Sequence, residues 1–576
     1  MKRILLLSFL FVSLTLSAWE RTPLWPDGKM PNKQDHQIAE MTNVSRLKDF
    51  NPDAFRMPYL EWFEAPSPEK KNGACIILIS GGSYMDCCDV KLIESWHRDL
   101  TALGFQCVNF VYRTPRPKNL PIYLTAWQDG QRAVRMVRSE AARRGYDPEK
   151  IGVFSMSAGS HLALMLGTSS QTPAYDPIDA LDATPCHINW AVVHAPAYVT
   201  TDGEKGTAAT RGGYGVDVTL SNVFRFDEKT CPMSLHHGGT DPYSPNGSTL
   251  IYRELRKLGI PAELHLYPNK AHGAFGFERG VEFMRQMGFM GTLEKEVPIM
   301  NRFPNDDDRG KYIKMDVWPS AQKTPDFQAH QCTPYIEWHF PKELKSKAIQ
   351  IVYSGGGYDT NDPDGASPTS VRRFLNSKGV TVVTMKYRTP RPQGLAKHTS
   401  AWQDLQRAIR LVRSLAPEYG LDSERIGIMG SSAGGHLTLM GVTSSCHPAY
   451  YRVDKTIDKL PCHVAWGVAV YPAYVLKDGD NGHNHHGGNL DEDVIVDDFS
   501  FDLKTAPTLF LHGDSDPYAS MGSVKVWEKM RAMGVQSELH TYATRVHGFH
   551  KSGAPGTGSY TWMDRLEEFL APFLKD

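Results

Sequence analysis

The sequence predicts an α/β fold made of two tandem domains, each a mostly parallel sheet with helices on both faces. A first observation is a repeated stretch: an apolar run, a serine between small residues and an apolar helical pattern follow one another at residues 151–161 and again at 426–436. A second is that runs of strand length alternate with amphipathic helical patterns through both halves. Strands that alternate with helices build a parallel sheet covered on both faces.

A constant offset between the two copies indicates a duplicated domain. The Trp-Gln-Asp stretch that begins at Trp127 returns at Trp402, and Ser157 returns as Ser432, each 275 residues later. Solenoid repeats are far shorter, at about 20–50 residues. We expect a first domain over residues 19–295, a polar linker over 296–315 and a second domain over 316–576.

The apolar runs predict six strands in each half. In the first half they are 74–79, 107–112, 151–154, 190–193, 233–236 and 262–267; in the second they are 349–353, 380–387, 426–429, 466–470, 508–511 and 538–542. Helical patterns follow, for example around 96–103 and over 129–144. Functional groups in such folds gather at the carboxyl ends of the strands.

The composition is that of an ordinary globular protein. Of 576 residues, 41% are hydrophobic and 22% are charged, and the formal net charge is −1. No long basic run indicates a nucleic-acid partner. The nine cysteines are an odd number without zinc-site spacing, so we predict neither a disulfide framework nor a metal site among them.

The N-terminus has the pattern of a signal peptide over residues 1–18. Lys2 and Arg3 precede an apolar run over 4–16, which ends in the small residues Ser17 and Ala18. That run is shorter than the roughly 20 residues that a membrane-spanning helix needs. The sequence therefore predicts an exported protein, secreted or periplasmic, without a membrane span.

Each repeat carries the pattern of a nucleophile elbow, small-x-Ser-x-Gly, centred on Ser157 and on Ser432. Small neighbours let the serine occupy a strained turn between a strand and a helix, with its hydroxyl clear of the backbone. The next residues, Ala158 and Ala433, begin the helix. We expect their amides to donate to an oxyanion.

An aspartate and a histidine follow each serine in the order of a hydrolytic triad. Each lies just beyond a predicted strand, and a parallel sheet brings such strand ends together. The serine-to-aspartate spacing is 84 residues and the aspartate-to-histidine spacing is 31 residues in both copies. The predicted triads are Ser157, Asp241 and His272 in the first copy, and Ser432, Asp516 and His547 in the second.

Two further positions near the acids need an interpretation. Asp514 competes with Asp516, but the first copy has Gly239 at the equivalent position, which favours Asp516. His237 and His512 precede the acids. We expect these two histidines to brace the acid loop rather than to act as bases.

A glycine-rich loop after an early strand is the second expected source of oxyanion donors. It reads Ser-Gly-Gly-Ser-Tyr at residues 80–84 and Ser-Gly-Gly-Gly-Tyr at 354–358. Glycine allows a backbone amide to approach a substrate closely. The predicted donors are Gly82 and Ser83 in the first copy, and Gly356 and Gly357 in the second.

Together these motifs resemble α/β-hydrolase carboxylesterases, in particular the branch with acetylxylan and feruloyl esterases. The resemblance covers roughly residues 55–290 and 335–576. It is carried by the glycine loops, Tyr-Arg-Thr-Pro, Trp-Gln-Asp, Ser-Ala-Gly-x-His, Asp-Pro-Tyr and the final His-Gly. It implies an α/β-hydrolase fold and a serine esterase that needs no metal or organic cofactor. It also implies an acylated polysaccharide or oligosaccharide substrate, such as xylan bearing acetyl or feruloyl esters.

The two copies differ around the predicted sites. The first has Ser155 two residues before its nucleophile and Ser83 in place of Gly357, and we expect these side chains to crowd its oxyanion side without abolishing activity. The stretch before the acid is Gly/Thr-rich at 200–215 but His-rich at 481–487, which suggests two ester preferences. A metal site at His483, His485 and His486 is the alternative to a polar loop there, and the polar loop is favoured.

Three other functions remain open at this point. A serine peptidase shares the fold, but no propeller-like domain that would gate peptides is visible in the sequence. A lipase or general arylesterase would need a wide apolar lid, which neither variable stretch suggests. The first copy is alternatively a binding module that has kept the fold, although its complete triad argues against this.

Overall fold

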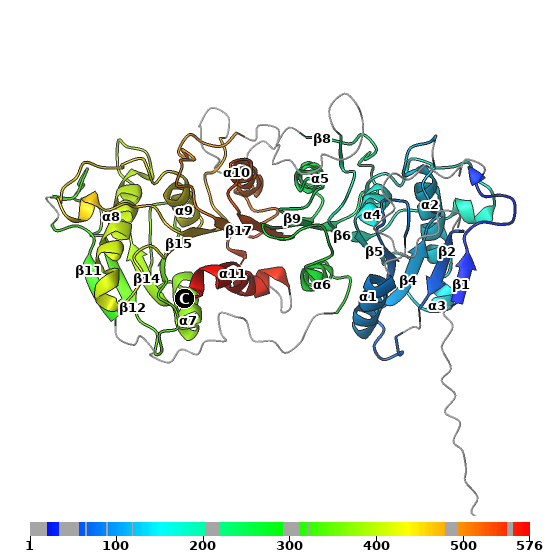
Figure 1. The fold of residues 1–576 in the computed structure, drawn as a ribbon, viewed down its shortest axis with the longest axis horizontal. Helices are drawn as coiled ribbons and strands as arrows, with labels where there is room; N and C mark the ends of the chain where they lie inside the picture. Colours follow the sequence, from blue (N-terminus) through cyan, green and yellow to red (C-terminus); the bar gives the residue numbers. More distant parts are fainter. Residues whose placement is uncertain are drawn as a thin grey trace, which may run out of the picture.

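The computed structural model describes residues 20–33, 57–63, 66–87, 90–117, 119–201, 218–291, 312–320, 323–477, 494–549 and 557–576. Within these residues one 16-stranded sheet runs along the length of the molecule (Figure 1). One half of its strands comes from the first half of the chain and the other from the second. The two domains thus share a single sheet.

The sheet strands of the first half are β1 (Glu20–Pro23), β2 (Tyr59–Trp62), β3 (Cys75–Ile79), β4 (Gln106–Val111), β5 (Ile151–Met156), β6 (Trp190–His194), β9 (Met233–Gly238) and β10 (Ala262–Tyr267). Those of the second half are β11 (Tyr312–Asp316), β12 (Tyr335–His339), β13 (Ile349–Tyr353), β14 (Thr381–Lys386), β15 (Ile426–Ser431), β16 (Trp466–Val470), β17 (Thr508–Gly513) and β18 (Glu538–Tyr542). A separate pair is formed by β7 (Thr200–Thr201) and β8 (Thr219–Leu220).

Both halves have the same strand order. From the outer edge inward it is β1-β2-β4-β3-β5-β6-β9-β10 and β11-β12-β14-β13-β15-β16-β17-β18. Only the outer strands β1, β2, β11 and β12 run antiparallel to their neighbours within a half. Inner strands such as β3, β13 and β16 are buried along their whole length, as expected for strands covered on both faces. The predicted α/β-hydrolase fold class is confirmed.

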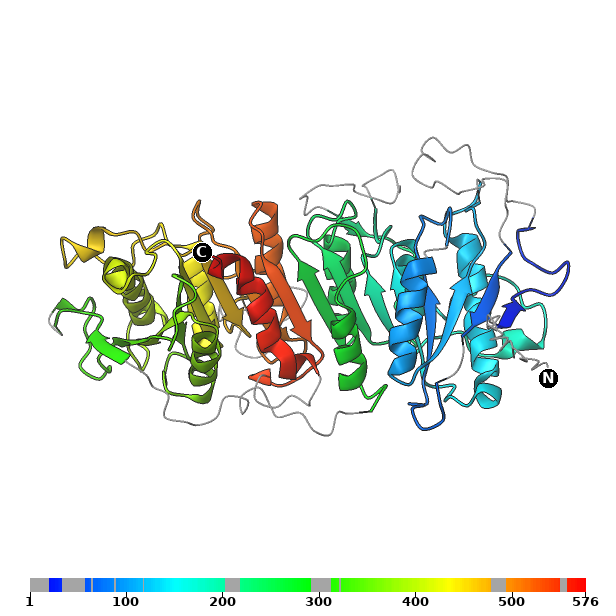
Figure 2. The ribbon, with the colours of Figure 1, turned by 60° about the horizontal axis from the view of Figure 1, so that its bottom comes forward.

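Helices cover both faces of the sheet (Figures 1 and 2). In the first half they are α1 (Val90–Ala102), α2 (Leu124–Ser139), α3 (Ala141–Arg144), α4 (Ala158–Thr168), α5 (Asn246–Lys257) and α6 (Phe277–Gln286). In the second half they are α7 (Ala366–Ser377), α8 (Thr399–Leu415), α9 (Ala433–Thr443), α10 (Met521–Ala532) and α11 (Gly558–Leu574). The apolar core lies between these helix layers and the sheet.

The helix predicted over 129–144 differs from the observed one. It begins earlier, at Leu124, directly after the turn at Pro121, and its regular part ends at Ser139. The short helix α3 follows and stops at Gly145, whose φ of 77° is the left-handed conformation common after a helix end. Periodicity alone did not place the first turn of this helix, whose residues Thr125, Ala126 and Trp127 are buried.

The Tyr-Arg-Thr-Pro motif has a structural role in both halves. The Arg113 guanidinium lies 2.9 Å from the Asp129 carboxylate, and Arg388 lies 2.9 Å from Asp404; these side chains are almost fully buried. The pair fixes the segment after β4 or β14 against α2 or α8. A buried ion pair of this kind is tolerated only where further hydrogen bonds satisfy both groups. Backbone carbonyls and Gln128 or Gln403 provide them.

The two halves join through their innermost strands. β10 pairs antiparallel with β18, with His265 opposite His540. Helix α5 packs against α10 and α6 against α11 on the two faces of the junction. These are equivalent elements of the two copies, so the junction has the self-complementary character of a twofold dimer interface.

Several predictions concern residues outside the described ranges. They include the signal peptide over 1–18 and the His-rich run at 481–487. The linker predicted over 296–315 also lies outside, except that β11 already begins at Tyr312. The domain boundaries therefore stay a prediction. Seven of the described cysteines are free thiols: Cys75, Cys107, Cys186, Cys231, Cys332, Cys446 and Cys462. Across the described residues, the helices are too short or too polar for a membrane crossing.

Candidate active sites

Ser157 and Ser432 occupy sharp turns, the first between β5 and α4 and the second between β15 and α9. Their backbone angles are strained and nearly identical, with φ 58° and ψ −123° in the first and φ 58° and ψ −120° in the second. Such conformations persist only where the surroundings fix them. A Cβ on Gly159 would lie 2.5 Å from the Ser80 carbonyl oxygen, so glycine is required for the close approach of helix and loop.

The first site connects three side chains from three strand ends. His272, after β10, lies 2.8 Å from Ser157 Oγ through Nε2 and 2.8 Å from Asp241 Oδ2 through Nδ1. Asp241 follows β9 and is buried, while Ser157 retains 7% exposure. This geometry allows proton transfer between serine and histidine.

The second site has the same arrangement. His547 lies 2.8 Å from Ser432 Oγ through Nε2, and its Nδ1 lies 3.0 and 2.9 Å from the two oxygens of Asp516. The structure thus brings all six predicted triad residues into two hydrogen-bonded chains. Their catalytic roles stay predictions that the geometry permits.

Asp241 is held in the ionised form by its surroundings. Burial favours the neutral acid, but hydrogen bonds from His237 and His272 outweigh it and lower the pKa of Asp241 to about 2. The Tyr243 amide donates to the other carboxylate oxygen at 2.8 Å. His237 also contacts the Ser248 hydroxyl at 2.8 Å and the Tyr243 carbonyl at 2.9 Å, so it braces the acid loop as expected.

The alternative acid Asp514 belongs to the junction between the halves. Its carboxylate accepts a hydrogen bond from the Ala262 amide at 3.1 Å and lies 3.6 Å from Arg256. Burial raises the pKa of Asp514 to about 6. Asp516, not Asp514, contacts His547.

The glycine loops lie directly against the nucleophiles. A Cβ on Gly81 would lie 2.6 Å from Ser157 Cβ, and one on Gly355 would lie 2.7 Å from Ser432 Cβ. Gly81 and Gly355 are not among the predicted site residues, although the doubled glycine in each loop was an available signal. The four predicted oxyanion donors in the glycine loops have positive φ: Gly82 (128°), Ser83 (56°), Gly356 (109°) and Gly357 (63°). Ala158 and Ala433 begin α4 and α9 beside them.

The Ser155 hydroxyl contacts α4 and β6. It lies 3.1 Å from the Ser160 hydroxyl on α4 and 3.4 Å from the Val192 carbonyl on β6. The glycine loop follows β3, which borders the opposite edge of β5. The Ser155 hydroxyl thus points toward α4 and β6, and crowding of the oxyanion side by Ser155 stays a prediction. In the second copy the Tyr353 ring fills this space, since a Cβ on Gly430 would lie 2.4 Å from it.

A row of aromatic rings joins each glycine loop to the histidine. In the first site Tyr84 stacks on Tyr198 at 6.1 Å, Tyr198 meets Tyr243 at 5.5 Å, and Tyr243 lies 5.3 Å from the His272 ring. The second site repeats the row with Tyr358, Tyr474, Tyr518 and His547. The central members of the row, Tyr198 and Tyr474, are not among the predicted site residues. The Ala-Tyr-Val string common to both copies could have revealed them.

The two sites differ beside the histidine. The Tyr471 ring lies 4.9 Å from the His547 ring and 5.6 Å from Phe549. At the positions of Tyr471 and Phe549 the first copy has Ala195 and Ala274. Both Ala195 and Tyr471 donate their amide to the next strand and have positive φ, which establishes the equivalence. The second site therefore carries larger side chains than the first beside its histidine.

Three side chains of metal-ligating types also lie together near the second site. His398, His436 and Asp498 each offer one potential ligand atom, and these atoms lie within 4.8 Å of one another. The His-rich run considered earlier, with His483, His485 and His486, lies outside the described residues.

One known protein family matches a segment in each half of the chain. The BD-FAE family matches this chain twice, over residues 63–193 and 336–489, and each match includes a glycine loop and a nucleophile elbow. Each half therefore resembles esterases of the α/β-hydrolase type, in particular acetylxylan and feruloyl esterases. Both matches end before the aspartates and the histidines of the predicted triads.

Individual relatives are distant. An acetylxylan esterase of Xylanibacter ruminicola is 25% identical over 251 residues, which are 41% of this chain and 46% of that protein. Endo-1,4-beta-xylanase B of Butyrivibrio fibrisolvens is 24% identical over 215 residues, which are 34% of this chain and 32% of that protein. The chain therefore spans less than half the length of these relatives.

Solved structures also match single domains of the chain. The acetyl ester-xyloside bifunctional hydrolase of Caldicellulosiruptor lactoaceticus is 22% identical with a TM-score of 0.34, over 48% of this chain and 100% of that one. Propionate-bound esterase 2 of Thermogutta terrifontis is 20% identical with a TM-score of 0.37, over 46% of this chain and 97% of that one.

Proposed function

We propose that this protein is an exported carboxylic ester hydrolase with two serine active sites, which removes acyl groups from plant cell-wall polysaccharide such as xylan. The observation that carries the proposal is the pair of Ser–His–Asp chains, whose contacts are all 3.0 Å or shorter. In each of these hydrogen-bonded triads the serine lies on a strained turn between a strand and a helix. Similarity to an acetylxylan esterase supports the substrate class.

In the proposed mechanism, Ser157 Oγ attacks the ester carbonyl carbon while His272 Nε2 takes its proton. Asp241, ionised because of its lowered pKa, stabilises the resulting imidazolium through Nδ1–H. The amide of Ala158 and an amide of the glycine loop stabilise the oxyanion. His272 then gives the proton to the leaving alcohol, and water releases the acyl group by the same steps in reverse.

The second site would run the same steps with Ser432, His547 and Asp516, but on a different ester. Tyr471 packs against His547 there, where the first site has Ala195. A bulky side chain at this wall removes room beside the reacting carbonyl. We therefore assign small acyl groups such as acetyl to the second site and larger ones such as feruloyl to the first.

The test compares wild type, Ser157→Ala, Ser432→Ala and the double variant on acetylated xylan, feruloyl esters and p-nitrophenyl acetate. We expect Ser432→Ala to lose acetyl release and Ser157→Ala to lose feruloyl release, each by about 10³-fold or more. Identical profiles of the two single variants would overturn the division of labour. Full activity of the double variant would overturn the mechanism, and loss of every activity in Ser432→Ala alone would make the first domain non-catalytic.

A further inference from the structure

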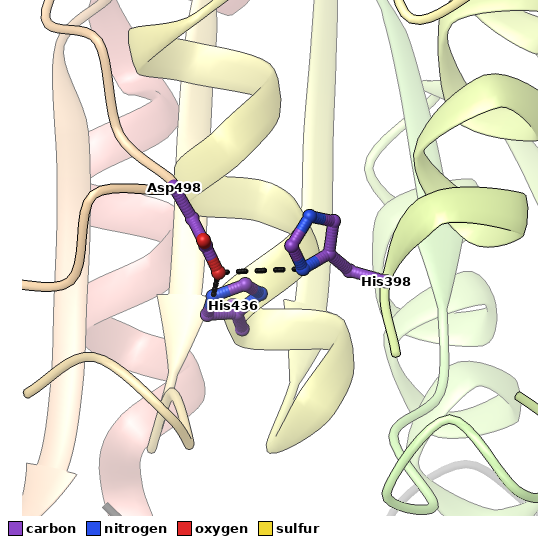
Figure 3. Close-up of side chains that lie close together, drawn as sticks. All are labelled: His398, His436 and Asp498. Carbon is purple, nitrogen blue, oxygen red and sulfur yellow. Dashed lines mark ion pairs between the residues drawn. The ribbon is translucent and has the colours of Figure 1, made fainter. Parts of the chain in front are cut away.

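Three side chains with metal-binding atoms converge beside the second nucleophile (Figure 3). His398 is the residue that precedes α8, His436 lies on α9 one turn after Ser432, and Asp498 precedes Phe499. Asp498 Oδ2 lies 3.2 Å from His436 Nε2 and 3.3 Å from His398 Nδ1. The three ligand atoms all lie within 4.8 Å of one another.

We propose that His398, His436 and Asp498 bind a divalent transition metal ion, with Zn²⁺ as the best fit. Zn²⁺ takes imidazole nitrogen and carboxylate oxygen at about 2.0–2.2 Å in tetrahedral geometry, which separates neighbouring ligand atoms by about 3.3–3.5 Å. The two contacts with Asp498 are close to this spacing. They exceed the roughly 2.7–2.9 Å of a hydrogen bond between a charged nitrogen donor and a carboxylate.

The surroundings of His436 suit a metal ligand. Its Nδ1 lies 2.8 Å from the Tyr358 hydroxyl. When Nδ1–H donates to that oxygen, the lone pair of Nε2 faces Asp498, which is the usual second contact of a metal-binding histidine. The His436 side chain is 1% exposed, whereas His398 and Asp498 are 14% and 16% exposed. Solvent therefore reaches the open side of the cluster, where water would be the fourth ligand.

The first domain has other residues at two of the three proposed ligand positions. Its His161 contacts the Tyr84 hydroxyl at 2.7 Å, as His436 contacts Tyr358. Tyr123 stands where the second domain has His398, and Val223 stands where it has Asp498. The equivalence rests on shared contacts: Tyr123 and His398 both precede the long helix, and the carbonyls of Val223 and Asp498 both accept from an equivalent serine. The metal set is thus particular to the second domain.

A bound metal would connect three segments around the second pocket. It would tie the start of α8 and the elbow helix α9 to the segment 494–499. The Tyr474 ring, which belongs to the pocket wall, lies 6.2 Å from the His436 ring. We therefore assign the metal a positioning role for this wall rather than a step in ester hydrolysis.

The test uses the untagged full-length chain after chelator treatment and dialysis. We expect calorimetric titration with ZnCl₂ and metal analysis to give one zinc per chain, with a zinc-dependent rise in Tm. His398→Tyr and Asp498→Val, which introduce the first-domain residues, should each lower zinc content at least tenfold and remove the Tm rise. Asp498→Asn, nearly isosteric, gives a second measurement in case either variant folds poorly.

A control separates this cluster from the His-rich run. A variant with His483→Gln, His485→Gln and His486→Gln should bind one zinc as wild type does. Cobalt substitution should give the strong visible absorption of a tetrahedral site in that control and in wild type, but not in Asp498→Asn. The proposal would be overturned if wild type bound no zinc, or if the variants of His398 and Asp498 bound as much zinc as wild type. Loss of zinc in the variant of the His-rich run would overturn it as well. Since zinc content is the readout, the result does not depend on the proposed esterase activity.

Discussion

His265 and His540, which are counterparts in the two halves, meet at the junction with their Nδ1 atoms 2.9 Å apart and both rings buried. On the far side of each ring, Nε2 faces a glutamate: Glu263 at 3.1 Å and Glu538 at 2.6 Å. Burial lowers the pKa of both histidines well below its usual value, so both rings are neutral. One hydrogen lies between the two Nδ1 atoms. All three contacts in the row Glu263–His265–His540–Glu538 can be hydrogen bonds only if one glutamate donates a proton to its histidine and the other glutamate accepts one.

Glu538 makes this junction sensitive to pH. Burial raises the pKa of Glu538 from 4.5 to about 7, against the opposing charges of Arg279 and Arg565. Between pH 4.5 and about pH 7, Glu538 is protonated in the folded chain and ionised in the unfolded chain. The contribution to stability, up to about 3 kcal/mol, is therefore complete below about pH 4.5 and is lost as the pH rises through about 7.

A Glu538→Gln variant should remove this dependence, because the amide side chain does not titrate. The Tm of the variant minus that of wild type should rise between pH 5 and pH 8, measured by calorimetry at constant ionic strength. Comparing the two proteins cancels the titration of the histidines, which destabilises the fold as the pH falls below about 6.5. A Tm difference that is the same at both pH values would contradict the assignment.

The two candidate acids of the second site should behave differently. Asp516→Asn should lower kcat by about 10⁴-fold, because the carboxylate no longer stabilises the protonated His547 or fixes its tautomer. Asp514→Asn should lower Tm but leave kcat within about twofold, since Asp514 contacts Ala262 and Arg256 at the junction. Both are measured with p-nitrophenyl acetate in a Ser157→Ala background. A large loss of kcat in Asp514→Asn would reverse the assignment.

Exchange of one wall residue should shift acyl preference. In a Ser157→Ala background, Tyr471→Ala should raise kcat/KM for a feruloyl ester relative to an acetyl ester by about 10-fold or more. In a Ser432→Ala background, Ala195→Tyr should shift the same ratio in the opposite direction. The ratio cancels changes in the amount of folded enzyme. Unchanged ratios in both variants would show that this wall does not select the acyl group.

Ser155 should matter for stability and not for catalysis. Ser155→Gly removes the contacts with Ser160 and Val192 and places glycine in a strand, at a cost of about 1–2 kcal/mol. We expect a lower denaturation midpoint and first-site kcat within about twofold of the parent, both measured in a Ser432→Ala background. An increase in kcat instead would support the crowding that the sequence suggested.

Much of each site could be predicted from local patterns. The apolar run before Ser432 and the helical pattern after it define a strand, a turn and a helix. The order and spacing of Asp516 and His547 then place both beyond strand ends. Tyr474 could not be predicted as a site residue, because a tyrosine in a loop has no local sequence pattern that indicates a pocket wall. Its positive φ and its contacts with Tyr358 and Tyr518 exist only in the folded protein.

The sequence by itself determined the duplication, the α/β order of each half and the residue types of the two triads, because these follow from periodicity and from fixed spacings along one strand–turn–helix unit. Only the tertiary structure decided that β10 and β18 join the halves into one sheet, which places His265 against His540. It also decided that His398, His436 and Asp498 converge, although 38 and 62 residues separate them along the chain. Pairing of two edge strands and convergence of distant side chains depend on how whole surfaces fit, and no local pattern encodes that.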